Sequence, residues 1–328
     1  MSVTAPAPCV LAIDVEPAQR LPVRGDTAPW NGFRQTVDFL VALRAEVGER
    51  SGDTPRFLWT MRMDPQVEVV HGTSTWVVDR HPELIERIVV AGDEVGLHVH
   101  AWRWDDASDG WVADYGDEEW VEHCLGFSFD AFRRAFGRGP KSFRSGDRFF
   151  SDRVVRHLER QGIKQDLTLE PGEPAQAGLF ANEAHTGELP DMRDVPRSPF
   201  QDGGLWFIPL TAGRWRPEVA TLDQTTRHVT SAVLKPFVDV PPYLWPARAG
   251  LGTLRLWESP RIFRDALRDA IANTPRPLLA FAIRTDMVLN PLIRRRMWRN
   301  LLAISQQGID VQFCPPAEAL SRWRDQQV

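Results

Sequence analysis

The sequence contains little cysteine, with only 3 such residues among 328. Cys9, Cys124 and Cys314 lie far apart, and no pair has the C-x-x-C spacing of a zinc site. An odd number of dispersed cysteines also argues against a disulfide framework, which small secreted domains use to compensate for a small core. Free thiols suit a reducing compartment, and we therefore expect a cytoplasmic protein.

Long apolar runs are also missing. No stretch approaches the roughly 18–20 apolar residues that a membrane-spanning helix requires. The N-terminal segment has no basic residue before Arg20, and Asp14 interrupts its apolar run. It therefore lacks the pattern of a signal peptide. We expect no membrane span.

Basic residues are not in excess, since 39 Lys and Arg face 44 Asp and Glu and give a net charge of −5. This balance argues against nucleic-acid binding, in which basic side chains neutralise phosphates. Tyrosine is scarce, with 2 residues against 13 tryptophans. Hydrophobic residues make up 43% and charged residues 25%, which is typical of a globular chain with a full core.

Apolar runs alternate with amphipathic segments along the whole chain. Such alternation predicts an α/β fold with a mostly parallel sheet. We expect strands at 9–14, 56–62, 94–102, 141–146, 164–172, 205–211, 277–285 and 310–315. We expect helices at 30–50, 82–92, 117–137, 151–162, 260–274, 290–308 and 316–326. Loops are predicted at 17–29 and 103–116. No linker composition appears, so residues 1–328 are interpreted as one domain with an irregular insertion around 171–258.

Polar side chains follow several of these strands. Ligands of parallel α/β folds gather at the carboxyl ends of the strands. His98 and His100 stand at positions i and i+2 of one strand, so their imidazoles point to the same side. Two such imidazoles can share a metal ion, and a carboxylate often completes the ligand set. Asp14 and Glu16 have the same spacing, and either could be that ligand while the other acts as a base.

An isolated H-x-H is more often a packed histidine beside a surface histidine than a metal site. Here the pair ends a buried strand that also contains Gly96, and a second acidic strand end is available, which favours the metal site. Metal-dependent amidohydrolases also use H-x-H, but theirs closes the first strand. This pair comes near residue 98 instead, so that alternative fits poorly.

Other strand-end residues are candidates for substrate binding. Arg62 ends one predicted strand, and Asp64 and Asp147 follow predicted strands. Trp102 and Trp104 follow the histidine pair, and indole faces stack well on sugar rings. Ordinary core packing is the alternative interpretation of these tryptophans.

Three ordered segments together resemble the polysaccharide deacetylases, the NodB-homology superfamily of carbohydrate esterases. These segments are LAIDVE, GDEVGLHVHAW and FRSGDRFFSDRVVRHLERQGIKQDLTLEPG. The resemblance covers residues 9–172 and, weakly, 277–285. It implies an irregular (β/α)7-type barrel. It also implies a divalent metal ion, most often zinc, and hydrolysis of an N- or O-acetyl group on a sugar or glycan precursor.

The resemblance assigns roles to individual residues. Asp14 corresponds to the base and Glu16 to the metal-binding carboxylate, or the reverse. His98 corresponds to the first histidine ligand. The second would fall at Trp102, and His100 is its substitute. Arg144 corresponds to an arginine that orients the base, and we expect it to form a bidentate pair with Asp14.

The late strand departs from the family pattern. Many relatives have a histidine there that acts as a general acid, whereas this chain has Arg284, followed by Asp286. An arginine does not release a proton near neutral pH, although it can stabilise an oxyanion. The sequence therefore predicts either a metal-dependent deacetylase or an impaired relative that binds a sugar without turnover. It does not specify the sugar, the acyl group, the metal or the oligomeric state.

Overall fold

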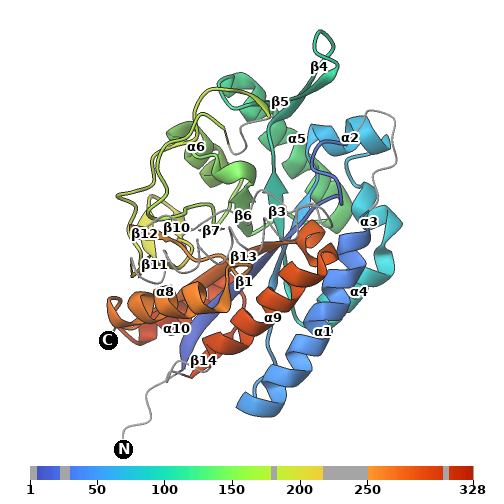
Figure 1. The fold of residues 1–328 in the computed structure, drawn as a ribbon. Coiled ribbons are helices and arrows are strands. Elements are labelled where there is room, and N and C mark those ends of the chain that lie inside the picture. The colour runs from blue at the N-terminus through green and yellow to red at the C-terminus, as the bar shows by residue number, and fades with distance from the viewer. Residues whose placement is uncertain (1–5, 23–29, 179–182, 217–249, 306–309, 328) are drawn as a thin grey trace, which may run out of the picture.

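The computed structural model describes residues 6–22, 30–178, 183–216, 250–305 and 310–327. Its main element is a nine-stranded sheet with the order β13-β1-β2-β3-β6-β7-β10-β9, in which β14 also pairs with β1 (Figure 1). Every pairing in this sheet is parallel except that of β9 with β10. The strands are β1 (Ala7–Val15), β2 (Leu58–Arg62), β3 (Glu94–Val99), β6 (Ser142–Ser145), β7 (Gln165–Asp166), β9 (Phe200–Asp202), β10 (Leu205–Phe207), β13 (Leu279–Arg284) and β14 (Val311–Phe313). The predicted α/β class, a curled and mostly parallel sheet of the (β/α) barrel type, is confirmed.

Helices pack around the outside of this sheet (Figure 1). They are α1 (Asn31–Ser51), α4 (Pro82–Val90), α5 (Glu118–Phe136), α6 (Asp152–Arg160), α8 (Pro260–Ala272), α9 (Pro291–Ile304) and α10 (Pro316–Asp325). Side-chain caps fix several of their starts. Ser151 caps α6 by accepting from Val154 N, and Asp117 caps α5 through two backbone N–H groups.

Strand β1 is buried along its whole length. Its side chains alternate between two apolar clusters on the two faces of the sheet. Leu11 and Ile13 pack into the larger cluster, and Val10 and Ala12 into the smaller one. Burial of one large aliphatic side chain stabilises the fold by about 1.5–3 kcal/mol. This continuous burial explains why β1 has no polar residue before Asp14.

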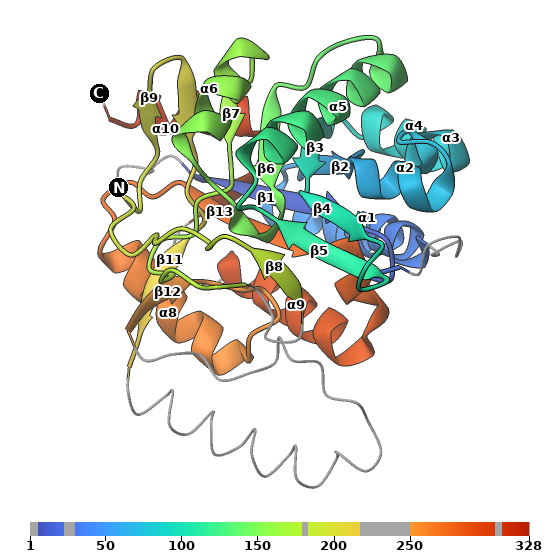
Figure 2. The same ribbon diagram turned by 90° about the horizontal axis from the view of Figure 1, so that it is seen from above.

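The prediction of a loop at 103–116, after the histidine pair, is wrong, because this segment contributes to a β-hairpin. Strands β4 (Trp102–Asp105) and β5 (Gly110–Asp114) pair antiparallel, and β8 (Ala184–Thr186) lies beside β5 (Figure 2). Trp104 and Trp111 face each other across the hairpin with ring centroids 5.1 Å apart. Cross-strand aromatic pairs of this kind stabilise a hairpin, and the acidic composition of the segment concealed it.

Other predicted boundaries also change. The strand expected at 164–172 shrinks to β7, because the side chain of Asp166 accepts a hydrogen bond from Thr168 N and turns the chain. The strand expected at 205–211 ends at Phe207. Two short helices were not predicted, α2 (Pro65–His71) and α3 (Trp76–Arg80). Within the predicted insertion, β11 (Ala212–Trp215) pairs with β12 (Gly250–Thr253), and residues 217–249 lie outside the described part.

Across the described part of the chain, no helix combines the length and the apolar character that crossing a membrane requires.

Candidate metal centre

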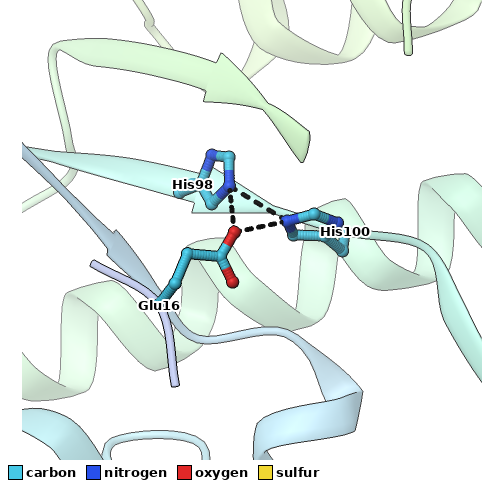
Figure 3. A group of neighbouring side chains, drawn as sticks. All are labelled: Glu16, His98 and His100. Atoms are coloured by element: carbon cyan, nitrogen blue, oxygen red, sulfur yellow. Dashed lines mark hydrogen bonds and ion pairs between the residues drawn. The ribbon is translucent and has the colours of Figure 1, made fainter. Parts of the chain in front are cut away.

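Three side chains converge beyond the carboxyl ends of β1 and β3 (Figure 3). Glu16 Oε1 lies 3.1 Å from His98 Nε2 and 2.8 Å from His100 Nε2. The two Nε2 atoms are 3.1 Å apart. Each of the three residues is only 2% exposed. The two histidines expected to share a metal therefore point to the same place, together with one of the two candidate carboxylates.

Two glycines make room for this arrangement. At Gly96 on β3, a Cβ atom would lie 2.7 Å from the backbone oxygen of Ser142 on the neighbouring strand β6. At Gly146, a Cβ atom would lie 2.4 Å from the ring of His100. Both distances are shorter than real Cβ contacts, so only glycine lets β6 and its following turn approach the histidines this closely.

A backbone contact sets the tautomer of His98. Its Nδ1 lies 2.9 Å from the carbonyl oxygen of Arg144, which can only accept a hydrogen bond. Nδ1 therefore carries the proton when the ring is neutral. The lone pair of Nε2 then faces Glu16, which is the orientation that a metal ligand needs.

The charge of Glu16 is also fixed. Burial alone would raise its pKa, but Arg62 and His100 hold that pKa well below its usual range. Arg62 Nη1 donates to Glu16 Oε2 at 2.7 Å and leaves Oε1 to the two histidines. A carboxylate oxygen and two imidazole nitrogens at this separation repel one another unless a cation or a proton lies between them. Two imidazoles and one carboxylate suit zinc and similar divalent ions, so these residues fit such an ion.

Asp14 lies outside this group of three. Its Oδ1 accepts from Thr60 Oγ1 at 2.7 Å, its Oδ2 accepts from Arg144 Nε at 3.0 Å, and His98 Nδ1 is 3.7 Å away. Burial alone would raise the pKa of Asp14, but His98 and Arg144 lower it below its usual range. Of the two carboxylates left open by the sequence, Glu16 is therefore the one beside both histidines, and Asp14 stands next to His98.

The expected bidentate pair between Arg144 and Asp14 is wrong. Arg144 gives Asp14 a single hydrogen bond, because its other nitrogens are used elsewhere. Nη1 donates to the Leu167 carbonyl at 2.8 Å, and Nη2 donates to Glu170 at 3.1 Å. The guanidinium therefore joins Asp14 to the segment that follows β7.

Arg284 and Asp286 form a pair of their own. Arg284 is the register partner of Asp14 on the adjacent strand β13, so both side chains leave the same face of the sheet. Its Nε and Nη2 donate to the two oxygens of Asp286 at 3.1 and 2.6 Å. The Arg284 side chain is 22% exposed. Both oxygens of Asp286 are thus occupied by Arg284, which disfavours the expected role of Asp286 as a proton donor.

Three residues expected to bind substrate are deeply buried. Arg62, Asp64 and Trp102 are at most 1% exposed, close to the 2% of the three clustered side chains. Asp64 accepts from Arg62 Nε at 2.7 Å and caps α2, so this pair supports Glu16 from behind. Trp104 is only partly buried, and its ring packs edge-to-face against that of Trp111.

Asp147, also expected to contact substrate, lies behind His100. Its Oδ2 is 3.1 Å from His100 Nδ1 and accepts from Tyr115 at 2.7 Å. Arg20 reaches its Oδ1 at 2.7 Å and binds Glu183 with two hydrogen bonds. Sequence reasoning missed Arg20, Tyr115 and Glu183, because each lies in a loop or hairpin without a recognisable pattern.

No family model matches the chain, and no curated protein matches it significantly in sequence. Solved structures share its fold. A Mycobacterium smegmatis protein classed as a polysaccharide deacetylase aligns with a TM-score of 0.53 at 15% identity, over 100% of this chain and 94% of that one. A Pseudomonas aeruginosa PAO1 protein classed in the same way gives a TM-score of 0.51 at 14% identity, over 97% and 91%.

A third similar structure is that of a Parabacteroides distasonis protein classed as a glycoside hydrolase/deacetylase. It gives a TM-score of 0.50 at 14% identity and covers 99% of this chain and 73% of that one. The fold of the chain is thus the fold of the polysaccharide deacetylases. The resemblance inferred from the three sequence segments is confirmed at this level.

Proposed function

We propose that this protein is a metal-dependent hydrolase that removes an N- or O-acetyl group from a sugar or glycan precursor in the cytoplasm. The observation that carries the proposal is the buried convergence of Glu16, His98 and His100 on a fold shared with polysaccharide deacetylases. A second carboxylate, Asp14, stands beside His98 with its orientation fixed by two donors. A ligand set and a separate base are the two parts that metal-assisted hydrolysis requires.

Glu16, His98 and His100 would hold the ion, and their donor atoms favour zinc. A bound divalent ion would polarise the acyl carbonyl and acidify a water molecule. Asp14 is kept ionised by Arg144 and His98, so a carboxylate oxygen is ready to accept the proton of the attacking water. Thr60 and Arg144 each occupy one side of that carboxylate and prevent it from rotating.

The leaving group has no evident proton donor among the described residues at the carboxyl end of β13. Arg284 does not release a proton, and Asp286 accepts from Arg284 at both oxygens. The Arg284 guanidinium can instead stabilise negative charge on an acyl or alkoxide oxygen. Cleavage of an ester needs less help from a general acid than cleavage of an amide. We therefore propose that the ratio of ester to amide cleavage rates is higher for this protein than for an enzyme with a histidine as general acid.

The pairing of Arg284 with Asp286 also supports a second candidate function. A protein that holds an acetylated sugar without turning it over needs the fold and the cluster but no proton donor. Acetate release separates the two functions. Wild-type protein loaded with zinc, cobalt or nickel should release acetate from O-acetylated and N-acetylated sugars above the metal-free control. Binding of these sugars without acetate release, in wild type and in Arg284→His, would favour the binding function and contradict the hydrolase.

A further inference from the structure

Asp147 occupies an unusual backbone position directly after β6. It lies in the short turn Gly146–Arg148 with a φ of 53°. This left-handed conformation is unfavourable for most side chains, and aspartate and asparagine tolerate it best after glycine. The side chain is only 2% exposed, so it points into the protein rather than toward solvent. The turn thus places a carboxylate behind the metal centre at a local conformational cost.

The carboxylate of Asp147 is surrounded by donors. Tyr115 donates to Oδ2 at 2.7 Å, and Arg20 reaches Oδ1 at 2.7 Å. Oδ2 also lies 3.1 Å from Nδ1 of His100, on the side of the imidazole away from Glu16. The carboxylate therefore has a fixed orientation, with one oxygen aimed at His100.

His100 Nδ1 has a second neighbour, the indole nitrogen of Trp102, also at 3.1 Å. An indole N–H only donates, whereas an ionised carboxylate only accepts. The two neighbours therefore demand opposite tautomers of a neutral His100. A bond to Asp147 places the proton on Nδ1 and leaves the Nε2 lone pair facing Glu16. A bond from Trp102 places the proton on Nε2, where it points at Glu16 Oε1 and blocks a metal.

We propose that Asp147 is a positioning residue that selects the metal-binding tautomer of His100 against the competing Trp102 N–H. This inference rests on the proposed metal centre and adds to it a residue that touches neither metal nor substrate. A carboxylate behind a ligand histidine also makes the imidazole a stronger donor, and loss of such a partner typically weakens metal affinity about 10–100-fold. Arg20 and Tyr115 keep the carboxylate in place.

The test is the affinity of purified full-length protein for zinc and cobalt, measured by competition with a chelator. Asp147→Asn tolerates the left-handed turn but lacks the charge, and we expect its affinity to fall about 10–100-fold. Asp93→Asn is the matched control. Asp93 is also a buried carboxylate that accepts from an arginine and an indole, but it precedes β3 at the end opposite the histidines. This control should keep wild-type affinity.

A second variant tests the competition from the other side. Trp102→Phe removes the indole N–H that donates to His100 Nδ1 and keeps an aromatic side chain. Alone it should bind zinc and cobalt at least as tightly as wild type, and in the Asp147→Asn background it should recover part of the lost affinity. Wild-type metal affinity in folded Asp147→Asn, or weaker metal binding by folded Trp102→Phe, would overturn the proposal. Failure of the wild type itself to bind metal would contradict the metal centre, whereas metal binding without acetate release would contradict only the hydrolase.

Discussion

The side chain of Arg144 donates to Asp14 across two intervening strands, from Nε to Oδ2 at 3.0 Å. The backbone carbonyl of the same arginine accepts from Nδ1 of His98. One residue of β6 therefore fixes both the candidate base and the tautomer of a candidate ligand. The backbone contact survives any substitution of the side chain, so mutation can separate the two effects.

Removal of the Arg144 guanidinium should damage both stability and activity. Arg144→Gln leaves the buried carboxylates of Asp14 and Glu170 without their shared partner. Such a loss typically destabilises a protein by about 3–5 kcal/mol. Urea unfolding measures this change. The control is Arg153→Gln, a partly exposed surface arginine that pairs with Glu118 and Glu122, for which about 0–1 kcal/mol is expected. Equal stabilities of the two variants would contradict this assignment of Arg144.

Either ligand histidine should be required for metal retention. His98→Ala and His100→Ala each remove one donor atom from the cluster, and the double variant leaves only Glu16. We expect the single variants to lose most of the bound zinc and the double variant all of it, as measured by elemental analysis after dialysis. His123→Ala is the control, because His123 is exposed and stacks on Trp120. Full metal content in the double variant would eliminate the proposed site.

Arg284→His should raise the rate of amide cleavage relative to ester cleavage. A histidine at this position can donate a proton to a leaving amine, and general acid catalysis contributes about 10²–10⁴-fold. The measurement is acetate release from N-acetylated and O-acetylated sugars by wild type and variant under the same metal loading. Arg193→His serves as the control, because Arg193 also pairs with an aspartate two residues away but is exposed. An unchanged ratio of amide to ester rates would reject the proposed role of this position.

The buried carboxyl of Asp166 should make folding depend on pH. Burial raises its pKa from 3.8 to about 6. Because the folded pKa lies above the unfolded one, this group stabilises the fold fully below the unfolded pKa, and that contribution disappears as the pH rises through the folded pKa. Two pKa units correspond to about 3 kcal/mol. Asp166→Asn lacks this term, so it should gain stability relative to wild type between about pH 4 and pH 7. The measurement is the free energy of unfolding of both proteins as a function of pH. The same pH dependence in wild type and Asp166→Asn would contradict the raised pKa.

Local pattern was enough to predict much of the fold. Continuous apolar runs identified β1, β3 and β13, and helical spacing identified α1, α5 and α9 with small errors at their ends. Local sequence patterns gave the wrong secondary structure where contacts of individual side chains change the course of the backbone. The hairpin of β4 and β5 depends on a tryptophan pair between its strands, and β7 ends early because Asp166 bonds to Thr168.

The sequence by itself determined that His98 and His100 share a side, because residues i and i+2 of a strand always do. It could not choose between Asp14 and Glu16, which obey the same rule. The tertiary structure made that choice, because the pairing of β1, β2 and β3 places Glu16 beside both imidazoles and Asp14 beside Arg144. Only the tertiary structure brought Arg20, Tyr115 and Asp147 together behind His100, because contacts between distant loops depend on chain packing and leave no periodic signal in the sequence.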